Sequence, residues 1–112
     1  MSEGGPVREA VSKLADMVEF QSDSIVSRIL AKTPAGNVTL FAFDRGQELS
    51  EHTTPHEALI YVVEGAARIG VGGEYHHTGS GDLVRLPANV PHSVSATEPF
   101  KMLLMMLRAP GG

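Results

Sequence analysis

The spacing of apolar residues predicts a short amphipathic segment at the start of the chain. Val7, Val11, Leu14 and Val18 recur at intervals of four and three residues, which places them on one face of a helix. The residues between them are mainly polar or charged. This pattern predicts a short α-helix near residues 7–18 that packs against a sheet or a neighbouring subunit.

From Ser24 onward the pattern changes to short apolar-rich segments separated by breaks that contain glycine, proline or asparagine. Several short strands at close spacing are typical of a β-sandwich or barrel. The predicted strand segments are SIVSRIL, VTLFAFD, ALIYVVEG, ARIGVGG, EYHHT, DLVRLP, HSVSA and FKMLLMML. Because 112 residues fit one domain of ordinary size, we expect a single domain, with a helix and lead-in over residues 1–23 and a β-barrel over residues 24–110.

Two of the predicted strands are apolar on both faces. Side chains alternate across a strand, yet all positions of ALIYVV (residues 58–63) are apolar, and FKMLLMML (residues 100–107) is interrupted only by Lys101. The side chains of one face can fill the barrel, but those of the other face must also be shielded from water. A chain of 112 residues with one helix has few residues left to shield them. We therefore expect a homodimer in which a second subunit covers this face.

Composition excludes several classes of function. The net charge is −4, and the basic residues are scattered singly from Arg8 to Arg108, which argues against nucleic acid or an anionic membrane as partner. Without any cysteine, the chain cannot form a disulfide framework, a zinc ribbon or a thiol nucleophile. The longest apolar runs are far too short to span a membrane, and the first residues show no signal-peptide pattern. We expect a cytoplasmic protein.

Two sets of spaced glycine, proline and histidine residues lie in the middle of the chain. They comprise Gly46, His52 and Gly65 in the first set, and Gly81, Pro87 and His92 in the second. In these spacings the chain resembles the small single-domain cupins of the RmlC-like type, roughly from Gly46 to Ala96. The resemblance implies a mainly β fold, the double-stranded β-helix or jelly-roll barrel, here preceded by the short N-terminal α-helix.

The resemblance also implies a partial metal site. Cupins hold a metal ion with two histidines and a glutamate of the first motif and one histidine of the second. His52 and His92 occupy two of these four positions, whereas Thr54 stands at the second histidine position and Ala58 at the glutamate position. Half of the usual ligand set is therefore missing. Asn89 replaces the family's glycine, a mild change because asparagine tolerates left-handed backbone.

His56 is a candidate for the missing ligand on strand geometry alone. If the strand runs straight, His52 and His56 point to the same side and form a three-imidazole set with His92. Such a set suits one divalent transition metal, for example zinc, nickel, copper, iron or manganese. Pro55 opposes this arrangement, because proline is favoured at bulges and edges and would turn His56 away. The predicted pocket is lined by His52, Thr54, His56, Ala58 and His92, with His52, His56 and His92 as metal ligands.

The alternative is a polar pocket without metal, in which His52 and His92 hydrogen-bond each other, water or a small ligand. His76 and His77 are adjacent, so at most one of them faces the barrel interior, and a surface or packing role suits them better. Arg85 interrupts an apolar segment and is better explained by a solvated strand face than by an inward anion site. Nucleophile-elbow and phosphate-loop signatures are absent from the sequence.

Three functions remain open from the sequence. The first is a binding module that holds a metal or a small organic ligand and has no strong chemistry of its own. The second is a metal-dependent enzyme, of the dioxygenase or isomerase class, acting on a small organic substrate. The third is a structural oligomer with a vestigial pocket. The fold does not choose among them, because one fold hosts many chemistries.

Overall fold

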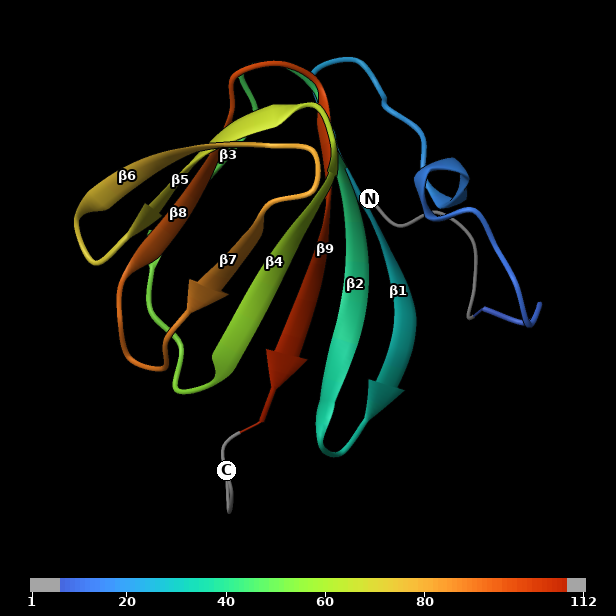
Figure 1. Ribbon diagram of the computed structural model, residues 1–112, viewed down its shortest axis with the longest axis horizontal. Coiled ribbons are helices and arrows are strands. Elements are labelled where there is room, and N and C mark those ends of the chain that lie inside the picture. Colours follow the sequence, from blue (N-terminus) through green and yellow to red (C-terminus); the bar gives the residue numbers. More distant parts are fainter. Residues whose placement is uncertain (1–6, 109–112) are drawn as a thin grey trace.

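Nine strands form two antiparallel sheets that pack face to face in the computed structural model, which describes residues 7–108 (Figure 1). The strands are β1 Ile25–Thr33, β2 Gly36–Phe43, β3 Glu48–His52, β4 Glu57–Glu64, β5 Ala66–Val71, β6 Glu74–Gly79, β7 Leu83–Leu86, β8 His92–Ala96 and β9 Phe100–Leu107. A five-stranded sheet has the order β1-β2-β9-β4-β7, and a four-stranded sheet has the order β3-β8-β5-β6. This arrangement confirms the predicted mainly β jelly-roll fold.

The core lies between the two sheets and is built by alternate residues of their facing strands. Even-numbered residues of β4 point inward, so that Ile60 and Val62 are buried. On the neighbouring part of the five-stranded sheet, the rings of Phe43 and Phe100 pack with their centroids 4.7 Å apart. Ile69 supplies the largest fully buried side chain of the four-stranded sheet. The alternation predicted for ALIYVV is therefore correct.

The predicted α-helix over residues 7–18 is wrong. Within this segment the structure has only a single 3₁₀ turn, Leu14–Met17, and Lys13 at its N-terminal end makes no capping hydrogen bond with its side chain. Val11 is 88% exposed, so the apolar stripe finds no surface to pack on at its N-terminal end. An isolated helix of this length is marginal in water, and tertiary contacts hold only its last residues. Residues 1–6 and 109–110 of the predicted domain regions lie outside the described residues.

The segment after this turn is held by contacts with the outer face of the five-stranded sheet. Val18 is fully buried in a second apolar cluster, against Leu40 and its neighbours on β1 and β2. The ammonium group of Lys101 donates a hydrogen bond of 2.6 Å to the carbonyl oxygen of Ala15 and lies 4.9 Å from the centroid of the Phe20 ring. The N-terminal segment thus covers part of the outer face along the β1 side (Figure 1).

No helix among residues 7–108 is long and apolar enough to cross a membrane.

Candidate functional site

His52 and His92 are neighbours on the four-stranded sheet. His52 is the last residue of β3, His92 is the first residue of β8, and the two are directly paired in the antiparallel register. The imidazole rings lie edge to face with their centroids 4.4 Å apart. The two motifs, which are separated by forty residues along the chain, therefore meet at one end of this sheet.

A β-bulge aligns the two side chains. Leu49 pairs with Val94 and packs against the core, but the register shifts before the next pair, His52 with His92. Simple alternation from Leu49 would turn residue 52 to the other face of the sheet, because three positions separate the two residues. The extra residue in β3 reverses this and places His52 beside His92. Bulges commonly re-aim side chains in this way next to functional sites.

Each imidazole is oriented by a backbone carbonyl two residues before it. Nδ1 of His52 lies 2.9 Å from the carbonyl oxygen of Ser50, and Nδ1 of His92 lies 3.3 Å from that of Val90. A carbonyl oxygen can only accept, so these contacts place the proton of each neutral ring on Nδ1. The second nitrogen of each ring, Nε2, then carries a free lone pair. This is the orientation found in histidines that bind metal ions.

The two Nε2 atoms face one another at hydrogen-bond distance, as the predicted alternative of a hydrogen-bonded histidine pair requires. Nε2 of His52 and Nε2 of His92 are 3.2 Å apart. Two ligand nitrogens about 2.0–2.1 Å from one tetrahedral zinc ion would be separated by about 3.3–3.4 Å, close to the distance between these atoms. A shared proton would also fit between them. The donor set therefore suits a cation, either a proton or a divalent transition metal.

The surroundings of His92 favour its neutral form. His92 is buried, with 8% of its surface exposed, whereas His52 is exposed. Burial lowers the pKa of the His92 imidazole below its usual value, and the nearby His52 lowers this pKa further. The hydrogen bond with the Val90 carbonyl opposes both effects. A lowered pKa keeps the Nε2 lone pair of His92 available near neutral pH.

His56 is not on the same strand as His52, so the condition of one straight strand is not met. β3 ends at His52 and belongs to the four-stranded sheet, whereas β4 begins at Glu57 and belongs to the five-stranded sheet. Pro55 and His56 form a bend where the chain passes from one sheet to the other. The alternation of side chains does not continue through such a bend.

The bend is tied to the loop that precedes His92. The backbone N–H of Asn89 donates a hydrogen bond of 2.7 Å to the carbonyl oxygen of Thr54. Asn89 has φ of 63°, which confirms the left-handed backbone expected at this position. The hydroxyl of Thr54 donates to the carbonyl oxygen of His56 at 3.2 Å. Thr54 therefore serves to fix the bend with its side-chain and backbone oxygens.

The remaining predicted pocket residue, Ala58, lies inside the barrel. It is 6% exposed, belongs to the core, and pairs with Leu86 and Met106 on the two neighbouring strands. Across residues 7–108, the structure contains no group of three or more His, Cys, Asp or Glu residues that could hold a metal ion. The side chains thus bring together two candidate ligands, His52 and His92.

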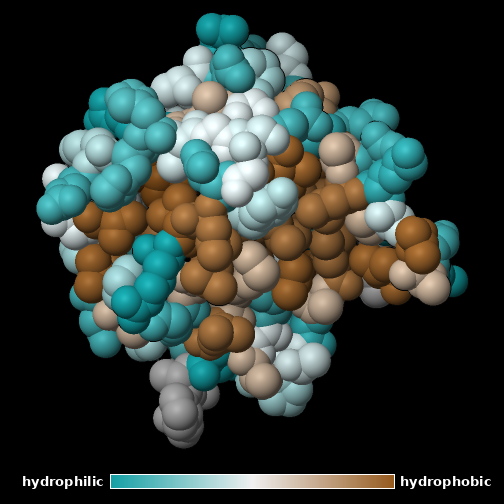
Figure 2. Space-filling view, viewed as in Figure 1, coloured by the Kyte–Doolittle hydropathy of each residue, from teal (hydrophilic) through white to brown (hydrophobic). Residues whose placement is uncertain are grey.

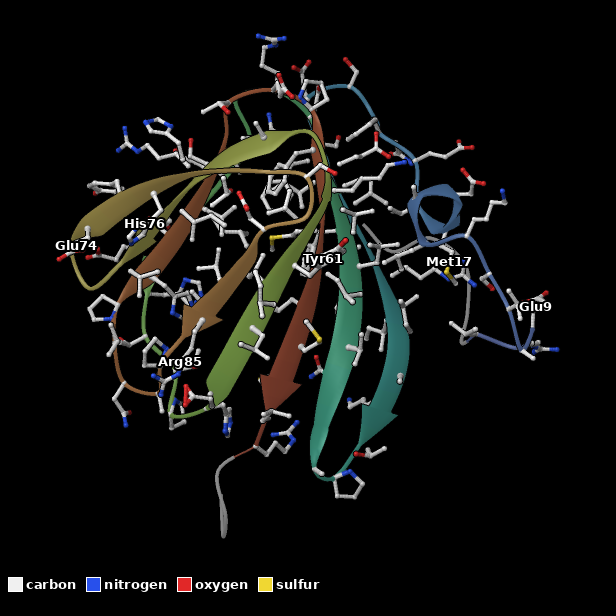
Figure 3. The ribbon with its side chains drawn as sticks, in the orientation of Figure 1. Glu9, Met17, Tyr61, Glu74, His76 and Arg85 are labelled. Carbon is white, nitrogen blue, oxygen red and sulfur yellow. The ribbon has the colours of Figure 1, made fainter. Side chains whose placement is uncertain are left out.

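The other candidate side chains lie away from this pair. His76 pairs with Ile69 of the core and lines a crevice of about 340 Å³ that also contacts Arg85, and the two residues are labelled in Figure 3. His77 pairs with the exposed Arg68 on the opposite side of the sheet. Arg85 is largely exposed and forms a 2.8 Å ion pair with Glu57, as expected for a solvated strand face.

Sequence reasoning missed the two groups that orient the histidine rings. The carbonyl oxygens of Ser50 and Val90 belong to the backbone, so no residue type at these positions reveals them. The bulge in β3 was also missed. A polar segment, ELSEH, gives little strand signal, although its distance from Gly46 in the motif did locate His52.

Comparison with protein families gives one match, to the model described as "Cupin domain", over residues 39–106. This range includes His52, His92 and most of both sheets. A search of functionally curated proteins found no match.

Solved structures with similar folds include proteins from several bacteria. A conserved protein of unknown function from Streptococcus pyogenes is 31% identical, with 92% of this chain and 91% of that chain aligned and a TM-score of 0.87. A cupin 2 conserved barrel domain protein from Leptotrichia buccalis is 38% identical over 84% of this chain and 46% of its own length, with a TM-score of 0.80. KdgF from a Halomonas species is 28% identical, with 82% and 86% of the two chains aligned and a TM-score of 0.70.

Proposed function

This chain belongs to the cupin family, and from that premise we propose that it is a small-molecule-binding cupin whose site is built on His52 and His92. Cupins include metal-binding enzymes and binding proteins, so the family by itself leaves the function open. The choice therefore rests on what the residues of this chain can do.

The observation that carries the proposal is the convergence of two oriented imidazoles. Both Nδ1 atoms are engaged by backbone carbonyls, and both Nε2 atoms face the same point at a separation of 3.2 Å. Holding two lone pairs this close is unfavourable unless a cation lies between them. If the two histidines only lined a polar pocket, turning one Nε2 toward water would give that atom a hydrogen bond with the solvent and would be more favourable.

We propose one divalent transition metal as this cation, held by His52 and His92. Two neutral imidazoles leave the full positive charge of the ion uncompensated, so a small anionic ligand such as a carboxylate is favoured as a further donor. When bound, the ion supplies a Lewis-acidic centre that fixes such a ligand. The protein's own contribution is to orient both rings and to keep His92 neutral.

Binding is favoured over catalysis by the missing ligands. Thr54 and Ala58 replace the histidine and the glutamate of the family pattern. The hydroxyl of Thr54 donates its hydrogen bond to the backbone carbonyl oxygen of His56. A metal ion with only two protein ligands is held weakly. An oxygenase or isomerase must retain its metal through turnover, so these residues do not support such an enzyme. The cytoplasmic location stays a prediction from composition.

The proposal is tested by isothermal titration calorimetry with zinc and nickel at pH 7.5, on untagged protein stripped with a chelator. We expect one ion to bind per chain, and His52→Ala and His92→Ala each to abolish binding. His77→Ala is the matched control, because it removes an imidazole from the opposite side of the four-stranded sheet. Equal heats of binding for all three variants would show that the histidine pair is not the site.

His56→Ala separates the two ligand sets predicted from the sequence. His56 lies in the bend outside β3 and joins no metal-ligand group among residues 7–108. We therefore expect this variant to bind zinc as tightly as the unaltered protein. A tenfold or larger loss of affinity would restore the three-imidazole site.

A further inference from the structure

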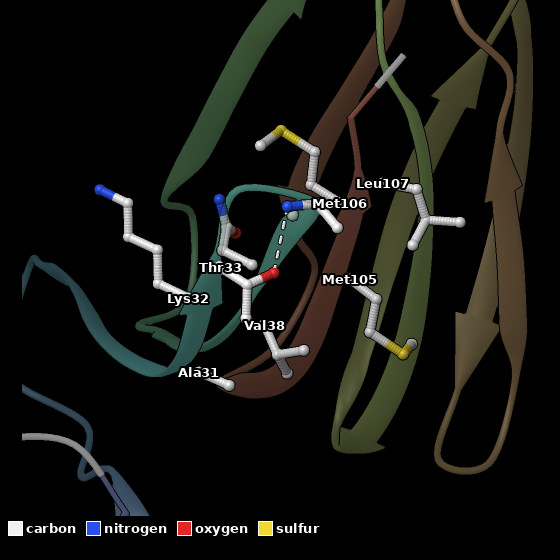
Figure 4. A pocket seen from close by; sticks show the side chains of 10 residues that line it. Ala31, Lys32, Thr33, Val38, Met105, Met106 and Leu107 are labelled. Carbon is white, nitrogen blue, oxygen red and sulfur yellow. Dashed lines mark hydrogen bonds between the residues drawn. The ribbon is translucent and has the colours of Figure 1, made fainter. Parts of the chain in front are cut away.

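The outer faces of the two sheets differ in character. That of the five-stranded sheet is apolar and forms the hydrophobic band across the front of Figure 2. Its hollow, a notch of about 210 Å³ where the β1–β2 hairpin meets the end of β9, has walls that include Ala31, Val38 and Met105 (Figure 4). The outer face of the four-stranded sheet instead carries a groove of about 420 Å³ with mainly polar walls, and volumes of this size are typical of small-molecule sites.

Strand register builds this groove across three neighbouring strands. β8 lies between β3 and β5, and its small residues Ser93 and Ser95 form the floor. Glu48 of β3 pairs with Ser95 on one side, and Arg68 of β5 pairs with the same serine on the other. Two strand spacings, or about 9–10 Å, therefore separate the two walls. Because buried and partly exposed residues alternate along β8, the groove lies on the opposite side of this strand from His92.

One wall of the groove is acidic. Glu48 and Glu51 of β3 line it together with Ser50, and both glutamates are exposed. A regular strand would turn only every second residue toward the groove. Ser50 and Glu51 lie within the β-bulge between Leu49 and His52, and this irregularity allows both of them to line it. The bulge therefore supplies the second carboxylate of the acidic wall.

The opposite wall is an ordered aromatic ring. Tyr75 of β6 pairs with Gly70 of β5, and a Cβ at Gly70 would lie 3.0 Å from Cε1 of Tyr75 and 2.6 Å from Oγ of Ser93. The glycine therefore lets the ring and the hydroxyl lean over the strand. The guanidinium carbon of Arg68 lies 4.1 Å from the centroid of the Tyr75 ring, a cation–π contact that holds the ring in place. Tyr75 is nevertheless 57% exposed, so part of its apolar surface is open to a ligand.

The polar side chains of the groove are not engaged by the protein. Across residues 7–108, the carboxylates of Glu48 and Glu51 and the hydroxyls of Ser93 and Ser95 form no hydrogen bond or ion pair. Arg68 and Glu48 carry opposite charges but stand on the two walls without pairing, because the floor strand separates them. Acceptors on one wall and donors on the other are therefore left for a ligand.

We propose that this groove binds a neutral saccharide, a ligand with many hydroxyl groups and no charge. Each hydroxyl both donates and accepts, so one sugar ring can donate to the carboxylates of the acidic wall and accept from Ser95 and Arg68. The exposed part of the Tyr75 ring offers a flat apolar surface to the C–H face of the sugar. Two carboxylates repel an anion and Arg68 repels a cation, so a neutral ligand suits both walls best.

Tyrosine fluorescence tests the proposal, because the chain has two tyrosines and no tryptophan. Tyr61→Phe leaves Tyr75 as the remaining tyrosine, and the substituted position lies on the other sheet. We expect glucose, galactose, mannose or cellobiose to give a saturable change in this variant at millimolar concentration. Tyr75→Phe is the matched control, which keeps an aromatic ring but leaves Tyr61 as the reporter, and it should show no change. No saturable change with any of the four sugars, or the same change in both variants, would overturn the proposal.

Filling the floor of the groove tests where the sugar lies. Ser95→Val adds bulk and removes a hydroxyl, and valine suits a strand. In the Tyr61→Phe background the affinity should fall about tenfold or more, while Ser95→Ala, which removes the hydroxyl alone, should give a smaller loss. Thermal denaturation followed by circular dichroism confirms that each variant is folded. Unchanged affinity in both folded variants would refute the assignment of the ligand to this groove.

The acidic wall is tested by comparing glucose with glucuronate, which carries a carboxylate on the same kind of ring. The Tyr61→Phe protein should bind glucose more tightly, because the carboxylates of the wall repel the anion. Glu48→Gln should raise the affinity for glucuronate relative to glucose by about threefold. Glu74→Gln, the same change at an exposed position outside the groove, should leave this ratio unaltered. Tighter binding of glucuronate or of spermidine than of glucose would contradict a neutral ligand. None of these measurements depends on the histidine pair.

Discussion

Lowering the pH should destabilise the metal-free protein through His92. Burial and the neighbouring His52 lower the pKa of His92 relative to its value in the unfolded chain, which is about 6.5. As the pH falls through 6.5, the unfolded chain therefore takes up a proton at this position before the folded protein does. The stabilising contribution is fully present above about pH 6.5 and is lost as the pH falls toward the folded pKa of His92.

The pH dependence of the free energy of unfolding is limited, because only one proton is taken up at His92. Between the folded and unfolded pKa values of a single group, the free energy of unfolding falls by at most about 1.4 kcal/mol per pH unit. His92 as a residue is 8% exposed, but its ring contacts the exposed His52, so solvent screens part of the burial effect. The contact with the Val90 carbonyl favours the charged form and reduces the slope below this limit.

The assay is urea denaturation between pH 8 and 5 in the presence of a chelator, followed by circular dichroism. Replacement of His92 by Gln removes the titrating ring, so we expect a shallower fall in the free energy of unfolding with decreasing pH. His77→Gln, on the opposite side of the four-stranded sheet, controls for the loss of an exposed imidazole. The same pH slope in all three proteins would refute the assignment of a depressed pKa to His92.

Two further predictions test the fold. Val18→Ala should lower the free energy of unfolding by about 2–3 kcal/mol, since it removes a fully buried side chain, whereas Val11→Ala should change it by less than about 0.5 kcal/mol, both measured by urea denaturation. Gly65→Ala should destabilise by more than about 2 kcal/mol, because φ is 79° and a Cβ would overlap the carbonyl oxygen of Pro99. Gly73→Ala, at φ of 86° with nothing within 4 Å of its Cβ, should show only the smaller conformational penalty; equal losses at the two glycines would contradict the steric argument.

The strands could be predicted because their signal is local. Alternation and turn residues located eight of the nine strands among residues 7–108, and β3 escaped because Glu48–His52 contains one apolar residue. The helix over residues 7–18 failed for the opposite reason. Its apolar residues have helical spacing, but contacts with residues far along the chain, such as that of Val18 with Leu40, determine its conformation. No periodicity within the segment contains that information.

Only those site residues that belong to the two spaced motifs could be predicted from the sequence. The spacing identified His52 and His92, and the structure places them 3.2 Å apart. The inference about His56 assumed one straight strand, but the chain leaves the four-stranded sheet at Pro55 and joins the other sheet. The tautomers depend on the carbonyls of Ser50 and Val90, which are features of the backbone conformation.

The most direct test of the central claim is a long-range ¹H–¹⁵N NMR spectrum of the histidine rings at pH 7.5, recorded before and after one equivalent of zinc. The account predicts that His52 and His92 both carry their proton on Nδ1 in the metal-free protein. It also predicts that zinc shifts their two Nε2 resonances together, while His77 is unaffected. An unprotonated Nδ1 on either ring, or no shift of the pair with zinc, would contradict a metal-binding role for these two histidines.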